Sequence, residues 1–156
     1  AMSERTQAPA RPQDFALLHP LRVRWSETDK QGIVFNGHYL TWFDIAQTEH
    51  FRLMGYRDPN GLARHGLDIF TVNANLDYRS PAHFDEMVTL AGRVEYLGRT
   101  SLRYRMAVFR DDTLLVEGSV TYVIATRQGR VPSPIPGDFI AAVTALEKIA
   151  PQRKAP

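Results

Sequence analysis

One amphipathic segment with an aromatic face constrains the fold of this chain most strongly. Its apolar and aromatic residues recur at steps of three and four positions, which is the spacing of one helix face. They are Tyr39, Trp42, Phe43, Ala46, His50 and Leu53. Asn36 is a candidate N-cap and Gly55 a candidate C-terminal stop, so the pattern predicts one helix between them. A lone helix with such bulky side chains needs a curved sheet to bury them.

Alternating apolar and polar residues predict strands on both sides of this helix. Before it, Leu21, Val23 and Trp25 alternate with polar residues, which predicts a first strand ending at Trp25. After it, four further strands are predicted over residues 69–78, 87–97, 102–110 and 113–125. The order of strand, helix and then several strands indicates an α+β fold with an antiparallel meander. Asp138 could begin a short terminal helix.

The composition fits one domain with a single core. The chain has 156 residues, of which 44% are hydrophobic. We predict a mobile polar arm over residues 1–16, one domain over residues 17–150 and a tail over residues 151–156. The chain has no cysteine, which excludes a disulfide framework and a thiolate nucleophile.

Charge and hydropathy bear on partners and location. A net charge of +2 is too small to predict nucleic-acid binding. No apolar run is long enough to predict a membrane span or a signal peptide, so a cytoplasmic location is expected.

The run that leads into the predicted helix combines a carboxylate with a helix start. Asp29 would lie in a loop that Gly32 allows to turn sharply, and the helix that opens near Asn36 would begin with unpaired backbone N–H groups. A carboxylate can act as a base or a nucleophile, and N–H groups at a helix start can bind a developing oxyanion. The combination suits chemistry at a carbonyl. A loop aspartate beside glycine is also typical of a residue that caps a turn.

The same run resembles the signature of a known enzyme family. Glu27-Thr28-Asp29, Gly32-Ile33-Val34-Phe35, and Tyr39 with Trp42-Phe43 are similar to the pattern of the 4-hydroxybenzoyl-CoA thioesterase branch of the hotdog-fold acyl-CoA thioesterases. The likeness extends more loosely from residue 21 to residue 132. It implies a hotdog fold, in which a curved antiparallel sheet wraps around one long helix. It also implies hydrolysis of an acyl-CoA to a free acid and CoA, with acyl-carrier protein as the alternative acyl carrier.

The resemblance also implies roles for individual residues. Asp29 would be the catalytic carboxylate, either as a nucleophile or as the base for a water, and N–H groups near Asn36 and Gly37 would form the oxyanion hole. Many bacterial relatives carry a histidine at the position of Asn36, so this chain lacks that imidazole. The residues predicted to bind substrate are Trp25, Gly32, Phe35 and Tyr39 near the acyl group, and Arg99, Thr100 and Ser101 against the CoA nucleotide.

Other chemistries fit the sequence less well. The five histidines lack HExxH spacing, and no GxSxG elbow or phosphate loop is present, so neither a metal site nor a cofactor is expected. A second thioesterase layout would place the catalytic carboxylate within the helix, at Asp44 or Glu49. A non-catalytic module that binds acyl-CoA or acyl-carrier protein would keep Arg99 but tolerate the loss of Asp29. Arg103 and Arg105 are typical of a solvated strand face.

Self-association is the last expectation. The resemblance implies a homodimer or homotetramer with active sites at the dimer interface, because one protomer leaves a sheet edge uncovered. One subunit would supply Asp29, and its neighbour would supply part of the pocket from the strand over residues 69–78.

Overall fold

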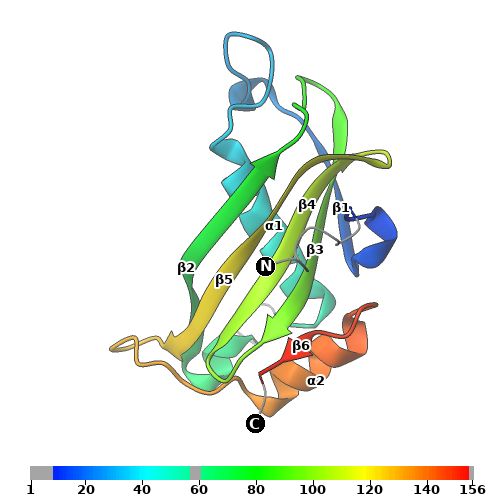
Figure 1. Cartoon of the computed structure of the whole chain (residues 1–156). Coiled ribbons are helices and arrows are strands. Elements are labelled where there is room, and N and C mark those ends of the chain that lie inside the picture. Colours follow the sequence, from blue (N-terminus) through cyan, green and yellow to red (C-terminus); the bar gives the residue numbers. More distant parts are fainter. Residues whose placement is uncertain (1–8, 57–60, 155–156) are drawn as a thin grey trace, which may run out of the picture.

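An antiparallel sheet packed on one central helix forms most of the chain (Figure 1). The computed structural model describes residues 9–56 and 61–154. The strands are β1 (Leu17–Arg22), β2 (Leu67–Tyr78), β3 (Met87–Leu97), β4 (Ser101–Arg110), β5 (Thr113–Thr126) and β6 (Gln152–Arg153). The helices are α1 (His38–Leu53) and α2 (Gly137–Leu146), with short 3-10 turns at Pro12–Asp14, Trp25–Glu27 and Leu62–His65. The predicted α+β class is confirmed.

The strand order explains where the helix sits. The sheet runs β1-β3-β4-β5-β2, so β1 and β2 are its edges, and β6 pairs in parallel with β3. Helix α1 crosses one face, behind the sheet as drawn in Figure 1, and contacts β3, β1 and β4. Gly92 on β3 faces the helix, since a Cβ there would lie in ordinary contact with the Ala46 Cβ at 3.8 Å.

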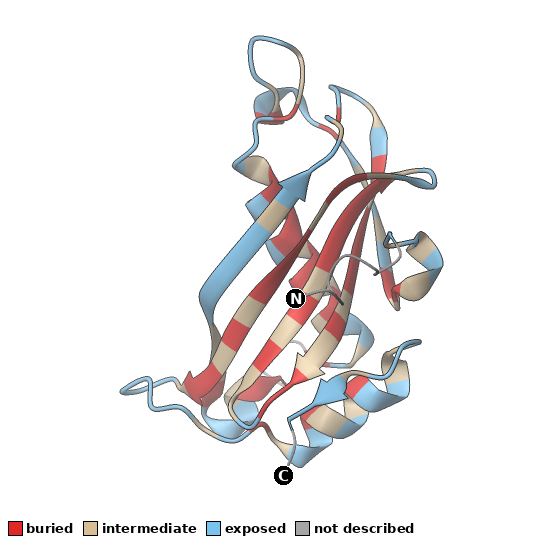
Figure 2. Ribbon diagram, viewed as in Figure 1, coloured by how far each residue is buried: buried red, intermediate tan, exposed pale blue. Residues whose placement is uncertain are grey.

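The predicted aromatic face of α1 is the centre of the core. Tyr39, Trp42, Phe43 and His50 are all buried, as the spacing predicted. Figure 2 shows the buried residues gathered on β3, β4, β5 and the sheet-facing side of α1. The prediction for Leu53 was wrong, because this residue lies in the last turn of α1 and its side chain is 53% exposed.

The first strand lies earlier in the chain than predicted. It covers Leu17–Arg22, whereas Trp25 lies in a 3-10 turn and is 71% exposed. The chain leaves the sheet here because the Glu27 carboxylate accepts a hydrogen bond from the Arg24 backbone N–H at 2.8 Å. The Arg24 N–H therefore donates to this side chain and not to a neighbouring strand, as the alternation of Val23 and Trp25 had predicted it would.

The later strands agree with prediction, but the exposure of β2 does not. Strands β2 to β5 fall within two residues of the predicted bounds. The alternation along β2 predicted buried side chains at Val72 and Tyr78, yet these are 57% and 53% exposed. Because β2 is an edge strand with most of its residues exposed, a row of its backbone groups has no strand partner among the described residues.

Both ends of the described chain pack against the sheet. Phe15 is fully buried and makes an edge-to-face contact with Phe109 at a centroid distance of 6.0 Å. The chain is therefore anchored to the sheet from Phe15 onward; residues 1–8 of the predicted arm lie outside the described residues. At the other end, β6 pairs with Tyr96 and Leu97 of β3.

A buried polar network joins α1 to the sheet and to the end of α2. The Tyr104 hydroxyl lies 2.8 Å from His50 Nδ1, and His50 Nε2 lies 2.8 Å from Glu147 Oε2. The Val94 backbone N–H donates to the same Glu147 oxygen at 2.6 Å. The side chains of His50 and Glu147 are both 0% exposed. Sequence analysis did not single out Glu147, because no local pattern marks a partner 97 residues from His50.

Removal of one member of this network should be costly. We expect His50→Leu to lower the free energy of unfolding by about 3–5 kcal/mol, because the Glu147 carboxyl would stay buried without its partner. Urea unfolding measures this loss. Thr41→Leu, an exposed change on the same helix, is the control and should shift stability by about 0.5 kcal/mol or less. A loss from His50→Leu no larger than that of the control would contradict a structural role for the network.

Candidate active site

The loop that carries Asp29 is a tight turn held by its own backbone. The Asp29 N–H donates to the Ile33 carbonyl at 2.9 Å, and the Gly32 N–H donates to the Asp29 carbonyl at 3.0 Å. Gly32 has a φ of 77°, a conformation that glycine adopts without the Cβ clash that other residues meet. Thr28 and Val34 pair across the base of the turn. The sequence prediction that Gly32 turns the chain beside Asp29 agrees with this geometry.

One oxygen of the Asp29 carboxylate is hydrogen-bonded within the turn, and the other has no donor among the described residues. The Oδ1 atom accepts a hydrogen bond from the Gln31 backbone N–H at 2.8 Å. No other described residue donates to the carboxylate, and the side chain is exposed. The interpretation of Asp29 as a turn-capping residue agrees with this hydrogen bond, and its catalytic role stays a prediction.

The start of α1 lies next to this loop, but Asn36 does not cap it. The N-cap position is Gly37, with no side-chain capping bond, so the N-cap prediction for Asn36 was wrong. The Asn36 carbonyl instead accepts a hydrogen bond from the Tyr78 hydroxyl at 3.2 Å. Within the described part of the chain, the backbone N–H groups of Asn36 and Gly37 have no acceptor. These two donors are available to an oxyanion.

A hollow of about 490 Å³ is lined by Asp29 and Asn36, whereas the predicted site residues Gly32 and Gly37 do not line it. Four of the predicted site residues line it, namely Asp29, Phe35, Asn36 and Tyr39. The sequence analysis missed the remaining lining residues, which are Ile33, Val34, Tyr78, Arg79, Ser80 and Pro81. Tyr78 is the last residue of β2 and the other three follow it directly, so the sheet brings all four to the Asp29 loop from 49 residues or more along the chain.

Two tyrosines and one arginine define the far wall of this hollow. The Tyr39 oxygen accepts a hydrogen bond from the Ala82 backbone N–H at 3.2 Å, and burial raises the pKa of its phenol, so Tyr39 is neutral at physiological pH. The ring of Tyr39 packs edge-to-face on Tyr78 at a centroid distance of 5.7 Å. Arg79 pairs with Glu117 at 2.6 Å, and that hydrogen bond raises the pKa of the guanidinium.

Glu27 fixes the loop to the helix. One carboxylate oxygen accepts the Trp42 indole N–H at 2.6 Å, and the Glu27 carbonyl accepts the Phe35 N–H at 2.9 Å. Burial raises the pKa of the Glu27 carboxyl, but hydrogen bonds from Arg24 and Trp42 lower it by more, so the pKa lies below its usual value. Glu27 therefore stays charged at neutral pH and holds both ends of the Asp29 loop.

The other predicted substrate residues lie away from this hollow. Trp25 does not line it and packs instead on Phe84 at a centroid distance of 5.2 Å. Arg99, Thr100 and Ser101 lie at the turn between β3 and β4, at the opposite end of the sheet from Asp29 in Figure 1. Strand β3 alone has 11 residues, which corresponds to about 35 Å. One protomer thus does not bring Arg99 to Asp29.

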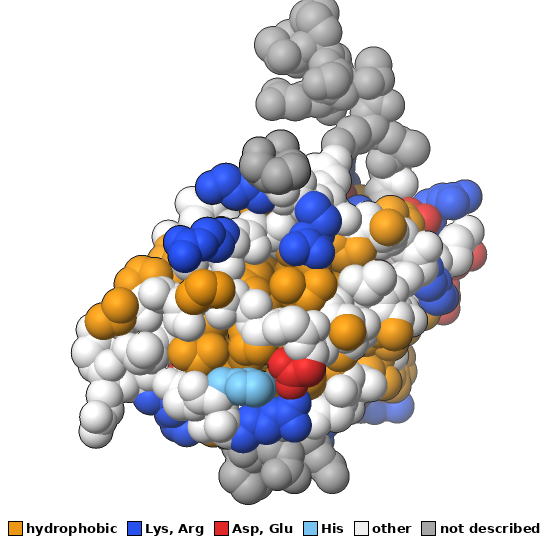
Figure 3. All heavy atoms as spheres, turned by 90° about the horizontal axis from the view of Figure 1, so that it is seen from below, with side chains coloured by type: hydrophobic (Ala, Val, Ile, Leu, Met, Phe, Trp, Pro, Cys, Tyr) orange, Lys and Arg blue, Asp and Glu red, His pale blue; other side chains and the backbone are white. Residues whose placement is uncertain are grey.

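The end of the molecule that carries Arg99 has its own character. Figure 3 views it from below and shows hydrophobic side chains gathered at the centre with basic side chains among and around them. The Arg99 carbonyl accepts the Ile135 N–H at 2.9 Å, while the residue itself is exposed. The contact of Arg99 with the CoA nucleotide, which the resemblance implied, stays a prediction.

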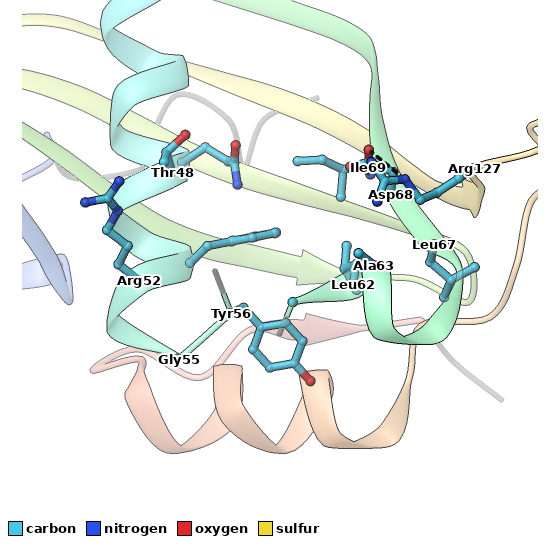
Figure 4. Close-up of a pocket in the computed structure, with 13 residues that line it drawn as sticks. Thr48, Arg52, Gly55, Tyr56, Leu62, Ala63, Leu67, Asp68, Ile69 and Arg127 are labelled. Carbon is cyan, nitrogen blue, oxygen red and sulfur yellow. Dashed lines mark hydrogen bonds and ion pairs between the residues drawn. The ribbon is translucent and has the colours of Figure 1, made fainter. Parts of the chain in front are cut away.

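A larger hollow of about 830 Å³ lies beside the C-terminal half of α1, and sequence analysis missed it (Figure 4). It mixes apolar residues such as Phe51 and Ile69 with the cations Arg52 and Arg127. Its walls come from α1, the Leu62–His65 turn and the start of the edge strand β2. The two alternative catalytic carboxylates, Asp44 and Glu49, line neither this hollow nor the Asp29 hollow.

Metal clusters and membrane-spanning helices are both absent from the described residues. No cluster of three or more histidine, aspartate or glutamate side chains is arranged to hold a metal ion in residues 9–56 and 61–154. None of the helices in these ranges is long and apolar enough to cross a membrane.

The sequence matches a protein family and is similar to named relatives. Residues 31–117 match the model of a protein family that is described as "Thioesterase superfamily". A putative esterase of Aquifex aeolicus is 28% identical over 117 residues, which cover 74% of this chain and 89% of that protein. The acyl-CoA thioesterase YbgC of Haemophilus influenzae is 23% identical over 129 residues, covering 83% of this chain and 95% of that protein.

Solved structures share the fold. The PA5185 protein of Pseudomonas aeruginosa superposes with a TM-score of 0.79 at 26% identity, covering 90% of this chain and 97% of its own. A hypothetical protein of Thermus thermophilus superposes with a TM-score of 0.75 at 27% identity, covering 83% and 98%. The hotdog arrangement predicted from the sequence is confirmed.

The Glu27 contacts predict a pH-dependent stability difference. We expect Glu27→Gln to lower the free energy of unfolding by about 1.5–3 kcal/mol near neutral pH, because Arg24 and Trp42 lose a charged acceptor. The folded-state pKa of Glu27 lies below its unfolded value of about 4.3. The stabilisation is therefore present above that value and is lost as the pH falls through the folded-state pKa.

Urea unfolding of wild type and variant at about pH 7 and about pH 3 checks this prediction. The difference between the two proteins should shrink at the lower pH. Glu49→Gln, which removes a carboxylate that is 24% exposed and pairs with the exposed Arg52 at a long distance of 3.7 Å, is the control and should show little difference at either pH. A Glu27→Gln effect that is the same at both pH values would count against the charged contact.

Proposed function

This chain belongs to the thioesterase superfamily, and on that premise we propose that it hydrolyses acyl-CoA thioesters with Asp29 as the catalytic carboxylate. The family resemblance inferred from residues 27–43 is thereby confirmed at the level of the superfamily, whereas the substrate and the roles of the residues are proposals. The name of the Haemophilus influenzae relative, an acyl-CoA thioesterase, supports a CoA ester as the substrate. The expected products are a free acid and CoA.

One observation carries the proposal. Among the described residues, one Asp29 carboxylate oxygen has no donor, and the backbone N–H groups of Asn36 and Gly37 have no acceptors. The loop with Asp29 and the helix start at Asn36 border the same hollow. A thioester carbonyl placed between them would meet a base or nucleophile on one side and oxyanion donors on the other. The N–H groups belong to a helix start, where the helix dipole also favours negative charge.

Two routes use this geometry. In the first, an Asp29 oxygen bonds to the thioester carbon, the C–S bond breaks, and CoA leaves as a thiolate that takes a proton from solvent; water then hydrolyses the mixed anhydride. In the second, Asp29 removes a proton from a water that attacks the same carbon, and that proton passes to the departing thiolate. In both routes the negative charge that develops on the carbonyl oxygen is bound by the N–H groups of Asn36 and Gly37.

Wall residues suggest where the acyl group would lie. Phe35, Tyr39 and Tyr78 line the hollow beside Asp29 and would contact an acyl group once its thioester carbonyl is bound. The Tyr78 hydroxyl fixes the Asn36 carbonyl and hence the plane of the peptide that supplies the Gly37 N–H. Tyr78 is therefore proposed as a residue that positions the oxyanion donors, a role that the sequence analysis did not assign.

Two protomers would complete the site. Strand β2 is a long edge strand with exposed apolar residues, among them Val72, and it ends at Tyr78 beside the Asp29 hollow. An antiparallel pairing of two β2 edges would reverse the second protomer end for end. The Arg99 end of the neighbour would then approach the Asp29 end of the first protomer. This arrangement accounts for the separation of Arg99 from Asp29 within one chain.

The Asp29 carboxylate is tested by removing its charge. We expect Asp29→Asn to lower kcat about 100-fold or more on whichever acyl-CoA the wild type hydrolyses, with the fold unchanged, because the amide can neither attack nor remove a proton. Thiol release from a panel of short, long and aromatic acyl-CoA esters measures the rate. Asp44→Asn is the matched control, since Asp44 is an exposed aspartate on α1 and should retain activity. Activity that survives Asp29→Asn and is lost in Asp44→Asn or Glu49→Gln would move the site to the helix.

A wild type that binds acyl-CoA esters without hydrolysing any of them would contradict the proposed activity. That outcome would favour a non-catalytic binding module for acyl-CoA or acyl-carrier protein.

The second prediction concerns the shared site. We expect Arg99→Gln to raise KM about tenfold, because a phosphate group would lose a charged donor. Mixed oligomers of Arg99→Gln and Asp29→Asn subunits should regain wild-type KM, since one of their sites combines the native Asp29 of one subunit with the native Arg99 of the other. Asp44→Asn in place of Asp29→Asn is the control for the mixing step. A KM in the Asp29→Asn mixture equal to that of Arg99→Gln alone would show that Arg99 does not serve the neighbouring site.

A further inference from the structure

Four hydrogen-bond donors form a straight row across the face of the sheet that α1 does not cover. In the register of the strands, Arg93 on β3 lies opposite Arg105 on β4, Arg105 lies opposite Ser119 on β5, and Ser119 lies opposite Asn75 on β2. Neighbouring residues of Arg93 and Arg105, Gly92 and Met106, face α1. Because side chains alternate along a strand, the four residues of this donor row project from the opposite face, which Figure 1 shows in front.

One of the two arginines of the donor row, Arg93, lacks a matching anion. Like charges placed directly opposite on neighbouring strands destabilise a sheet. Arg105 donates to Glu95 at 3.2 Å, but Arg93 forms no ion pair with any described carboxylate. The Nε of Arg93 is buried and, among the described residues, has no hydrogen-bond partner. A buried donor without an acceptor is unusual enough in folded proteins to need an explanation.

Three of the carboxylates nearby are already used, and a fourth, Asp77, lines a hollow with Arg93 and Arg105 but forms no ion pair with either of them. Glu95 accepts from Arg103 at 2.6 Å as well as from Arg105. Both oxygens of Asp14 accept from Arg11, at 3.1 and 3.4 Å. Glu117, in the next row of the sheet, pairs with Arg79 at 2.6 Å. None of the three paired groups is left to neutralise Arg93.

The donor row lies in a hollow large enough for a ligand. This outer hollow has a volume of about 570 Å³, within the range of small-molecule sites. Three arginines, Arg93, Arg103 and Arg105, line it together with two acids, Asp14 and Glu95. It shares no lining residue with the hollow that contains Asp29.

The neutral members of the donor row add further donors. The Ser119 oxygen accepts from Asn75 Nδ2 at 2.8 Å, which leaves the Ser119 O–H free to donate into the outer hollow. Ser119 is itself only 5% exposed, so the hydroxyl is held in a fixed, largely dry position. The strands that carry the hydroxyl and the two guanidinium groups are about 5 Å apart, so all three side chains start from neighbouring positions on one face.

We propose that the donor row of Arg93, Arg105, Ser119 and Asn75 binds the phosphate or carboxylate group of a small molecule, separately from the Asp29 site. Planar guanidinium groups bind such oxyanions through two parallel hydrogen bonds. The bound anion would supply the acceptor that the Arg93 Nε lacks and would remove the repulsion between Arg93 and Arg105. The interpretation of Arg105 as part of a merely solvated face is thereby replaced.

Isothermal titration calorimetry of the full chain with inorganic phosphate, pyrophosphate and acetate, at constant ionic strength, tests the proposal. We expect saturable binding of at least one of the three, and the preferred anion distinguishes a phosphate from a carboxylate ligand. Arg93→Gln should weaken binding about tenfold or more, since a charge-assisted pair of hydrogen bonds is lost. Ser119→Ala, a smaller change, should weaken it less and guards against misfolding of the arginine variant.

Two matched controls make the result specific. Arg22→Gln removes the same charge from an exposed arginine at the end of β1 and should leave binding unchanged. Arg99→Gln should also bind inorganic anions as wild type does, which separates this site from the phosphate contact proposed for the substrate. The absence of saturable binding, or binding that Arg93→Gln and Ser119→Ala leave intact, would overturn the proposal.

The mass of the protein in solution gives the remaining outcome. Light scattering of wild type and Arg93→Gln should give the same oligomer. A smaller oligomer in Arg93→Gln would mean that a second copy of this chain supplies the missing anion, and the small-molecule site would then be rejected.

Discussion

Burial of the aromatic face of α1 against the curved sheet is the constraint on which the rest of the structure depends. Trp42 and Phe43 are almost completely buried where α1 contacts β3, β1 and β4. Burial of such large apolar side chains contributes roughly 1.5–3 kcal/mol each. The helix position in turn fixes where its N-terminus emerges from the sheet. Every group of the candidate active site is placed relative to that point.

The same helix face controls the candidate active site through a single side chain. Trp42 is a core residue whose indole N–H binds Glu27, and Glu27 holds the loop that contains Asp29. The packing of the core and the geometry of the site are therefore not independent. A residue that sequence analysis assigned to packing also positions the chemistry, because a buried indole needs an acceptor and the nearest one belongs to the loop.

The two faces and the two edges of the sheet contact different parts of the structure. One face buries α1, and the other carries the donor row of Arg93, Arg105, Ser119 and Asn75 together with the Phe15 anchor. The β2 edge is exposed and suited to a second protomer, while the β3 strand near the other edge also receives β6. The separation of Asp29 from Arg99 follows from strand length, so a site that needs both residues needs two chains.

The sequence by itself determined the elements and the reactive loop, because these depend on periodicity, turn residues and local hydrogen bonds. The aromatic spacing located α1, the alternation located β2 to β5, and Gly32 marked the turn beside Asp29. The alternation of apolar and polar residues gave the wrong end for the first strand at Trp25. The Glu27 carboxylate accepts the Arg24 N–H there, and the chain leaves the sheet.

Only the tertiary structure decided which distant residues meet. Tyr78 and Arg79 reach the Asp29 hollow because β2 ends there, and Glu147 meets His50 because α2 ends over the core. Arg93 and Arg105 face one another because the register of β3 and β4 aligns them. Periodicity gives the face of each element but not its neighbour. Those neighbours are set by strand order and register, which depend on the packing of the whole chain.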